Sequence, residues 1–327
     1  MKILVLRFSS IGDIVLTTAV VRCLKRQIPG AQIHYLTKKS FENILYNNEN
    51  VDELITFEKK TDEVLARLKS EKYDCIVDLH NNIRTLKLKA KLRVKSYTFP
   101  KKNISKFLLT TFKINKMPKI HVVDRYFKAV EKLGVHNDCL PNDYFLTNDD
   151  IVDLKSVNLE SKKFLAVAMG TQFETKLMPI DLLEKVLKDS SIPVVLLGGK
   201  NDIERSEELK KLLKTQQIVD FCGKLTIGQS AFICKEASQL LTGDTGLMHI
   251  AACFDTPIVS VWGNTVPELG MYPYVPQKED GFTIHEVKDL TCRPCSKIGY
   301  HACPKGHFNC MNLQNAEAIQ KDILDEL

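Results

Sequence analysis

Short apolar runs alternate with helix-like patterns along most of the chain, and this alternation constrains the fold more than any other sequence feature. The run Lys2–Leu6 is followed by a polar turn, and apolar residues from Ile14 to Leu24 then recur at helical spacing. Further strands are expected at 32–36, 53–57 and 73–79. Strands that alternate with helices indicate a parallel sheet covered on both faces. We therefore expect an α/β fold with doubly wound parallel sheets.

The alternation stops in a polar, acidic stretch at residues 145–162 and then starts again. A length of 327 residues suits two domains that each bury a core. We predict one domain at 1–150 and a second at 151–327, the latter ending in a Cys-rich loop (292–310) and a terminal helix. Two such domains predict a bilobed molecule in which the interdomain cleft is the default site.

The composition is ordinary, with 26% charged and 44% hydrophobic residues, which excludes disordered, collagen-like and disulfide-dense classes. Arg7 and Asp13 interrupt the apolar start, so it does not suit a signal peptide, and no run of 18 apolar residues follows. We expect a cytoplasmic protein with reduced thiols.

The polar loop Ser9–Asp13 follows the first expected strand, where open α/β sheets bind ligands. It lacks the glycines of a dinucleotide fingerprint. Asp13 is a candidate general base, although a carboxylate near a helix start needs a desolvated setting to accept a proton. The alternative is that Ser10 or Asp13 only caps the helix.

Two loops of the second half suit phosphate oxygens. Asp244-Thr245-Gly246 joins a strand to a helix that carries His249, and main-chain N–H groups at such a junction bind anions. Thr171 and Lys176 follow another strand and add a hydroxyl and a cation. The alternatives are a capped helix with His249 in the core, and a solvated lysine. Asp202, which follows Gly198-Gly199, suits a ribose hydroxyl or a helix cap.

Residues 84–128 hold fourteen Lys or Arg against one acid, Asp124, although the net charge of the whole chain is only +6. Tyr97, Phe99, Phe107 and Phe112 lie among these cations. This block suits an anionic membrane surface or a phosphorylated lipid. Nucleic acid is the competing anion, and a solvated face is the remaining alternative.

Four of the ten cysteines cluster near the end of the chain, at positions 292, 295, 303 and 310. A CxxC pair followed by two more cysteines has the spacing of a structural zinc site with ligands Cys292, Cys295, Cys303 and Cys310. Four thiolates close the coordination shell, so we expect no catalysis there. Free thiols or disulfides are the alternatives.

Taken together, the chain resembles the bacterial heptosyltransferases of glycosyltransferase family 9. The motifs that carry the resemblance occur in family order: KILVLRFSSIGDIVLTTAVV, YDCIVDLHNNIRT, HVVDRYFKAVEKLGV, AMGTQFETKLMP and LLTGDTGLMHIAACFDTPIVSVWG. The match covers nearly the whole chain and is weakest after Trp262.

The resemblance implies a GT-B fold of two Rossmann-like domains and an inverting, metal-independent transfer from a nucleotide-sugar, typically ADP-heptose. The implied acceptor is the lipopolysaccharide core or a related anionic glycolipid at the cytoplasmic face of the inner membrane, where the enzyme would bind as a peripheral protein. Asp13 would be the base and Lys176 would stabilise the leaving diphosphate. The other implied donor contacts are Thr171, Asp202, Asp244, Thr245, Gly246 and His249. The implied acceptor contacts are Asn81, Asn82, Arg84, His121 and Arg125.

Two other functions compete with this hypothesis. One is a nucleic-acid-binding module without catalysis, in which the Cys cluster forms a zinc knuckle. The aromatic residues do not follow an RNA-reading pattern, which disfavours it. The other is a nicotinamide-dependent oxidoreductase, which the missing glycine fingerprint disfavours.

Overall fold

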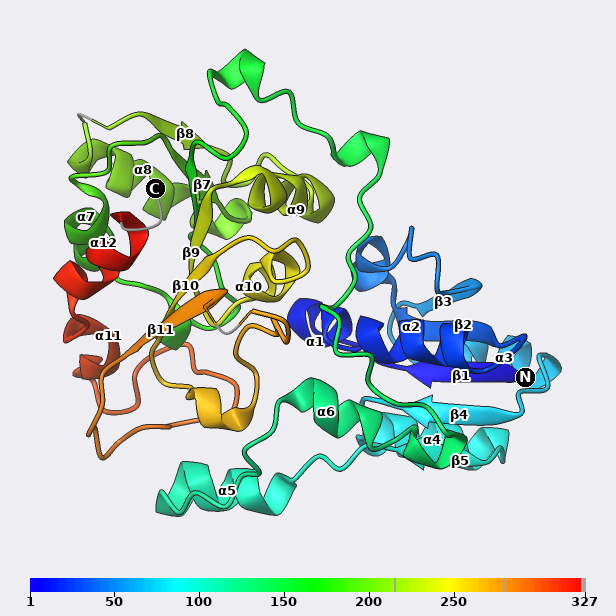
Figure 1. The fold of residues 1–327 in the computed structure, drawn as a ribbon. Coiled ribbons are helices and arrows are strands. Elements are labelled where there is room, and N and C mark those ends of the chain that lie inside the picture. The colour runs from blue at the N-terminus through cyan, green and yellow to red at the C-terminus, as the bar shows by residue number, and fades with distance from the viewer. Residues whose placement is uncertain (215, 279, 325–327) are drawn as a thin grey trace. The chain divides into compact units, whose positions relative to one another are not determined.

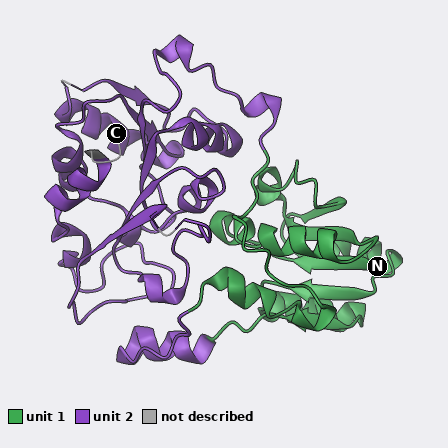
Figure 2. Cartoon of the chain, viewed as in Figure 1, with its two compact units in different colours: residues 1–102, 120–145 green, residues 103–119, 146–327 purple. Residues whose placement is uncertain are grey.

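The computed structural model describes residues 1–214, 216–278 and 280–324, and the chain divides into two compact units. Unit 1 comprises residues 1–102 and 120–145, and unit 2 comprises residues 103–119 and 146–327 (Figure 2). The segment 103–119 therefore packs with the second half of the chain although it lies in the first half of the sequence. Among the described helices, none is both long and apolar enough to cross a bilayer.

Unit 1 is built on a five-stranded parallel sheet with the strand order β3-β2-β1-β4-β5 (Figure 1). Its strands are β1 (Lys2–Leu6), β2 (Gln32–Lys38), β3 (Glu53–Phe57), β4 (Cys75–Asp78) and β5 (Ser96–Thr98). Residues 3–6 and 75–78 are buried without interruption. Strands covered on both faces need apolar side chains in both directions, which explains their near-continuous hydrophobic sequence.

Helices flank this sheet on both faces. They are α1 (Ile11–Val15), α2 (Thr18–Gln27), α3 (Leu65–Ser70), α4 (Ile83–Leu92) and α6 (Val122–Phe127), with 3-10 turns at Lys39–Ile44, Thr61–Val64 and Glu131–Leu133. Helix α2 packs beside α6, and α3 packs beside α4. Leu68 of α3 and Leu88 of α4 join one core cluster with Leu4, Leu6 and Ile76 of the sheet.

Unit 2 is built on a six-stranded parallel sheet with the strand order β11-β10-β9-β6-β7-β8. Its strands are β6 (Leu165–Ala168), β7 (Val194–Leu197), β8 (Ile218–Asp220), β9 (Gln239–Gly243), β10 (Ile258–Trp262) and β11 (Phe282–Glu286). Counted from β6, this is the 3-2-1-4-5-6 order of a Rossmann sheet. The doubly wound parallel architecture expected from the sequence is confirmed in both units.

Helices of unit 2 cover its sheet on two sides, whereas α5 packs on residues that follow β10 (Figure 1). The helices of the unit are α5 (Asn103–Phe112), α7 (Ile180–Leu187), α8 (Ile203–Leu212), α9 (Ile227–Glu236), α10 (Gly246–Ala251), α11 (Asn309–Asn312) and α12 (Ala316–Leu324). Short 3-10 turns lie at Asn148–Asp150, Lys155–Val157, Glu174–Lys176, Lys200–Asp202 and Pro267–Leu269. Leu183, Leu209 and Ile319 place α7, α8 and α12 in one core cluster, whereas Ile233 and Met248 place α9 and α10 in another. The two clusters are the two faces of the sheet.

Each sheet has one topological switch point, at which the strand order reverses. It lies between β1 and β4 in unit 1 and between β6 and β9 in unit 2. The loops that leave the carboxyl ends of such a pair run to opposite faces of the sheet and leave a crevice for ligands. In unit 1 these loops begin at Arg7 and Leu79, and in unit 2 they begin at Met169 and Asp244. The topology therefore selects these loops as candidate sites within each unit.

Arg22 of α2 fixes the segment by which the chain leaves unit 1. Its buried guanidinium contacts Asp138 at 2.9 Å and Asp143 at 2.5 Å, and it donates to the carbonyl of Pro141 at 2.9 Å. Burial of the guanidinium has the largest single effect on the pKa of Arg22 and would lower it. The hydrogen bonds and charges of Asp138 and Asp143 together outweigh burial and raise the pKa above its ordinary value. This ion-pair network holds residues 138–143 against α2.

We expect Arg22→Met to reduce the free energy of unfolding by about 3–5 kcal/mol, because it leaves two carboxylates without their buried partner. Chemical denaturation of the full chain measures this loss. Arg26→Met on the exposed side of the same helix is the matched control, with an expected change within about 0.5 kcal/mol. Equal stability of the two variants would contradict the assigned role of the network.

Candidate active site

Asp13 lies in the loop after β1, as the third residue of α1. Its carboxylate accepts a hydrogen bond from the Ser10 hydroxyl at 2.9 Å and from the Ser10 main-chain N–H at 3.4 Å. The side chain of Asp13 remains 22% exposed. Asp13 therefore stabilises the helix start, as the capping alternative predicts, and one edge of its carboxylate stays open to solvent.

Arg7 holds the other oxygen of this carboxylate, with Nη2 of Arg7 and Oδ1 of Asp13 at 2.5 Å. The guanidinium is buried and also donates to the Leu79 carbonyl at 2.7 Å and the Tyr126 hydroxyl at 3.1 Å. Burial alone would lower the pKa of Arg7, but the Asp13 charge and neighbouring groups raise it. A permanently charged partner fixes the orientation of the Asp13 carboxylate.

The loop after β4 brings His80 to the same edge of unit 1, a residue that the sequence analysis did not select. Its ring packs on Phe8 with centroids 4.9 Å apart, and the Arg84 guanidinium lies 5.5 Å from the Phe8 centroid. The Lys101 ammonium donates to the His80 carbonyl at 3.2 Å. Desolvation, followed by the charges of Arg7, Lys101 and Arg84, lowers the pKa of His80 to about 3. His80 is therefore neutral at physiological pH and lies among cations.

Both ring nitrogens of His80 are buried without a hydrogen-bond partner among the described residues. A buried imidazole in that state is destabilising by itself. The cations that surround it favour an anionic ligand at this edge. One signal in the sequence could have identified His80. It lies two residues after a strand and directly before Asn81-Asn82.

The five predicted acceptor residues fall into two groups. Asn81, Asn82 and Arg84 lie together after β4, whereas His121 and Arg125 lie on α6. Asn82 caps α4 by accepting from the Thr85 N–H at 3.0 Å, and His121 caps α6 by accepting from the Val123 N–H at 3.1 Å. The Asn81 amide donates to the Phe99 carbonyl at 2.9 Å. Three of the five side chains thus have structural bonds, and their contact with an acceptor stays a prediction.

Lys176 and Asp244 meet in unit 2, where the loops after β6 and β9 approach each other. Nζ of Lys176 lies 2.7 Å from Oδ2 of Asp244, and the Thr265 hydroxyl donates to the same oxygen at 2.9 Å. Gly243 permits this approach, because a Cβ at that position would lie 2.7 Å from the Lys176 carbonyl oxygen. The structure therefore joins two of the predicted donor residues in one partly exposed ion pair.

Asp202 and Thr171 lie beside this pair along the same edge of the sheet. The Asp202 carboxylate accepts from the Gly199 N–H at 2.7 Å, which is the capping role that was one alternative for this residue. It also lies against Gly170, where no Cβ could be accommodated. The loops after β6 and β7 are thus in contact, and Thr171, whose hydroxyl accepts from the Phe173 N–H at 3.4 Å, is next to them.

The turn Thr245-Gly246 leads from β9 into the short helix α10. Thr245 is its N-cap, and its hydroxyl accepts from the Met248 N–H at 3.3 Å and shares a hydrogen bond with Thr242 at 2.9 Å. His249 is buried one turn into the helix. The capped-helix alternative thus describes the local structure, and direct donor contacts of Thr245, Gly246 and His249 stay predictions.

The loop after β10 adds Asn264 and Thr265, which the sequence analysis also missed. The Asn264 side chain is 1% exposed, and neither its amide nitrogen nor its oxygen has a hydrogen-bond partner within residues 1–214, 216–278 and 280–324. Its main-chain carbonyl accepts from the Cys295 N–H at 3.2 Å. The signal available in the sequence was this polar pair, which closely follows the buried strand β10, a neighbour of β9.

The Cys-rich loop packs against this edge. Thr175 donates to the Tyr300 carbonyl at 3.1 Å and accepts from its N–H at 2.8 Å. Burial raises the pKa of the Cys310 thiol to about 11; Arg293 lowers it, and the thiols of Cys295, Cys303 and Cys292 raise it. All four cysteines are free thiols.

These thiols do not form a preformed metal shell. Within the described part of the chain, the one group with three potential ligand atoms mutually within 4.8 Å is His34, Glu53 and Glu71 in unit 1. In that group Glu53 is paired with Arg67, and Glu71 is paired with Lys2 at 2.9 Å. Because protein cations already neutralise its carboxylates, we assign no metal to it.

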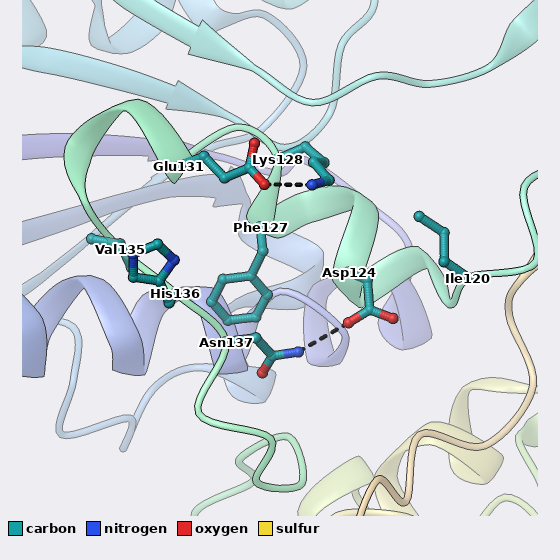
Figure 3. Close-up of a pocket in the computed structure, with 8 residues that line it drawn as sticks. All are labelled: Ile120, Asp124, Phe127, Lys128, Glu131, Val135, His136 and Asn137. Carbon is teal, nitrogen blue, oxygen red and sulfur yellow. Dashed lines mark hydrogen bonds and ion pairs between the residues drawn. The ribbon is translucent and has the colours of Figure 1, made fainter.

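A pocket on unit 1 is lined by none of the predicted site residues, although it lies on the helix that carries Arg125. Figure 3 shows it on α6 and the following turn, with Phe127 and Val135 among the residues that line it. Its polar side chains bind each other: Lys128 pairs with Glu131, and the Asn137 amide donates to Asp124 at 3.0 Å. Nothing in this arrangement resembles a catalytic group.

The sequence matches curated bacterial enzymes over most of its length. Lipopolysaccharide heptosyltransferase 1 of Campylobacter coli is 21% identical over 81% of this chain and 84% of its own length. Lipooligosaccharide heptosyltransferase 2 of Haemophilus influenzae is 24% identical over 87% of this chain and 88% of its own length.

Solved structures share the fold. A family 9 glycosyl transferase from Veillonella parvula superposes with a TM-score of 0.79 at 22% identity, covering 99% of this chain and 96% of its own. The heptosyltransferase WaaC of E. coli, solved with ADP, gives a TM-score of 0.70 at 18% identity and covers all of both chains. These likenesses confirm the expected fold class.

The sequence model of glycosyltransferase family 9 (heptosyltransferase) matches residues 63–298, which include the loops after β4, β6, β9 and β10. The family match therefore covers well over half of the chain, and it includes the Lys176–Asp244 pair. The chain belongs to glycosyltransferase family 9 and is a glycosyltransferase.

Proposed function

We propose that this enzyme transfers heptose from ADP-heptose to a lipopolysaccharide-core type of glycolipid, with inversion at the anomeric carbon and without a catalytic metal. The observation that carries the proposal is the pairing of Lys176 with Asp244 at the switch point of the unit 2 sheet, where a nucleotide diphosphate would bind. The names of the curated relatives, and the ADP in the E. coli WaaC structure, support heptose and ADP.

Asp13 is the proposed general base. In an inverting transfer the acceptor hydroxyl attacks the anomeric carbon opposite the departing diphosphate, and a carboxylate accepts the hydroxyl proton as the new bond forms. The bonds from Arg7 and Ser10 hold Asp13 in one orientation. They also weaken its basicity, so displacement of water around the open edge of the carboxylate contributes to its function.

Lys176 is the proposed stabiliser of the leaving group. Negative charge grows on the diphosphate as the glycosidic bond breaks, and a cation already positioned there lowers the barrier. Before the donor binds, Asp244 holds Lys176 at the loop edge, and the Thr265 hydroxyl donates to the same Asp244 oxygen. We propose that Lys176, the Thr171 hydroxyl and the main-chain N–H groups of Thr245 and Gly246 do the work that a divalent cation does in metal-dependent transferases. Asp202 would contact the ribose, and His249 would lie beside the phosphates.

The acceptor is the proposed partner of the cations around His80. Arg84 and Lys101, with Asn81, Asn82, His121 and Arg125, would bind the carboxylates and phosphates of an anionic glycolipid. Such an acceptor is held in a membrane, so we propose that the enzyme acts as a peripheral protein at the cytoplasmic face of the bacterial inner membrane. The alternative function, a zinc-knuckle module that binds nucleic acid, has no support among the relatives.

We expect Asp13→Asn to lower the transfer rate by about 100- to 10,000-fold, because the amide cannot accept the acceptor proton. Binding of ADP-heptose, measured by calorimetry, should persist because the predicted donor contacts lie in unit 2. Asp62→Asn, at an exposed carboxylate of unit 1, is the matched control and should keep full activity. Loss of donor binding with intact turnover would contradict the role of Asp13.

We expect Lys176→Ala to lower kcat/KM by about 100- to 1,000-fold and to weaken donor binding, because the diphosphate loses its cation. Steady-state kinetics and calorimetry with ADP measure the two effects. Lys185→Ala on the exposed side of α7 is the matched control. Unchanged kinetics in Lys176→Ala would remove this residue from the site.

We also propose that Cys292, Cys295, Cys303 and Cys310 hold a structural zinc ion. The spacing of the CxxC pair and the two cysteines that follow it supports this, and the thiols must come closer together than they do here to share one ion. His285, which precedes the Cys-rich loop, pairs with Asp322 at 2.9 Å and is therefore not a candidate ligand of this ion. Zinc would stabilise a loop that carries few apolar residues of its own.

Elemental analysis of purified protein should then find about one zinc per chain, as four thiolates close one tetrahedral shell. Cys303→Ser should remove the metal and lower the melting temperature, whereas Cys139→Ser, at an exposed cysteine outside the loop, should change neither. Metal-free protein with an unchanged melting temperature in Cys303→Ser would refute the zinc proposal and leave the transferase proposal intact.

A further inference from the structure

Helix α5 carries an uncovered apolar face on unit 2. The exposed fractions of Ile104, Phe107 and Phe112 in the helix are 78%, 56% and 58%, and that of Ile114, two residues after its end, is 48%. Phe107 and Phe112 contact each other edge to face, with centroids 5.8 Å apart. A soluble protein rarely gathers this many large apolar side chains at its surface unless something covers them.

The opposite side of the helix attaches it to unit 2. Leu109 is buried with Val266 and Leu269, and Met117 packs on the same cluster. Ile104 and Phe107 follow the i, i+3 spacing of one helix face, Leu109 lies away from that face, and Phe112 contacts Phe107 at the end of the helix. Packing of Leu109 therefore directs the exposed face outward.

Lys113 adds a polar attachment directly after the helix. Its ammonium donates to the carbonyls of Pro294 at 2.7 Å and Cys292 at 3.2 Å. It also donates to the Thr110 carbonyl at 2.8 Å, which caps the last turn of α5. The helix, labelled in Figure 1, is thus held to unit 2 through Leu109 and at its C-terminal end, whereas Ile104 and Phe107 remain exposed.

The charge around this face has one sign. Residues 79–123 contain no Asp or Glu, and they contain twelve Lys or Arg. Within the segment that packs on unit 2, these are Lys106, Lys113, Lys116 and Lys119. An apolar helix face bordered by lysines matches the boundary between the acyl chains and the anionic headgroups of a bilayer, where long lysine stems extend toward phosphates.

We propose that α5 and the turn 113–119 form the membrane-docking element of this enzyme, with an anionic bilayer as the partner. Ile104, Phe107, Phe112 and Ile114 enter the boundary of the acyl chains, and the neighbouring lysines bind lipid phosphates. The inference rests on the proposed function, because only a membrane-held acceptor requires the enzyme to be at a bilayer. Nucleic acid is a poorer partner, since a phosphate backbone would leave the apolar face uncovered.

Flotation of the full chain with vesicles tests this. The wild-type protein should bind vesicles that contain phosphatidylglycerol, should bind pure phosphatidylcholine vesicles more weakly, and should lose the difference at high salt. Ile104→Ser and Phe107→Ser should each weaken binding by about tenfold or more. Ile151→Ser and Leu313→Ser replace side chains that are 58% and 59% exposed elsewhere on unit 2, and they should bind like the wild type.

A fluorescent reporter locates the contact. The one native tryptophan, Trp262, is 1% exposed and should not respond to lipid. Phe107→Trp should show a blue shift of its emission with anionic vesicles, and Leu313→Trp should not. Equal binding of Ile104→Ser/Phe107→Ser and wild type would overturn the proposal. Self-association that these substitutions abolish, without any effect on vesicle binding, would also overturn it and assign the face to a second copy.

Activity separates this inference from the proposed function. The variant Ile104→Ser/Phe107→Ser should transfer sugar to a short, water-soluble acceptor at the wild-type rate and should lose activity toward acceptor embedded in anionic vesicles. If the wild-type enzyme bound these vesicles but transferred no heptose to either acceptor, the proposed function would fail and the docking element would stand. Equal loss of both activities in the variant would refute the docking role.

Discussion

Burial of both sheets on two faces determines where this protein can do chemistry. A parallel strand that is covered on both faces has little room for a charged group, so most charged residues lie in the loops at the strand ends. In unit 1 the loops after β1 and β4 hold Asp13 and His80, and in unit 2 those after β6 and β9 hold Lys176 and Asp244. These four loops leave the strands on either side of the two switch points, which is where an open α/β sheet has its ligand crevice.

The charged groups at both edges are paired within the protein. Arg7 binds Asp13, and Lys176 binds Asp244, so each edge presents a fixed ion pair rather than an isolated charge. In each pair, the partner of opposite charge holds the functional side chain in one orientation before a substrate binds. The same pairing limits reactivity, because each substrate has to compete with the partner that is already bound.

The sequence predicts most strands that have a clear apolar pattern and are followed by a polar turn. The bounds expected for β1, β3 and β7 agree with the structure. The edge strands β5, β8 and β11 have weaker patterns and were not predicted. Capping bonds of Asp202, Asn82 and His121 could not be distinguished from ligand contacts, since the same side-chain oxygens and nitrogens serve both purposes. The tertiary position of α5 has no local signal, because Leu109 meets Val266 and Leu269 from a remote part of the chain.

Residues 103–119 lie within the first half of the sequence but pack with unit 2, so neither unit is one continuous segment of the chain. The chain passes from one unit to the other after residues 102, 119 and 145. A fragment that starts at residue 146 would lack the leucine that covers Val266 and Leu269, and it would lose the lysine that binds the carbonyls of the Cys-rich loop. Cutting the polypeptide at the polar stretch between the halves would therefore leave the second half with an exposed apolar patch, because that half is not the whole of unit 2.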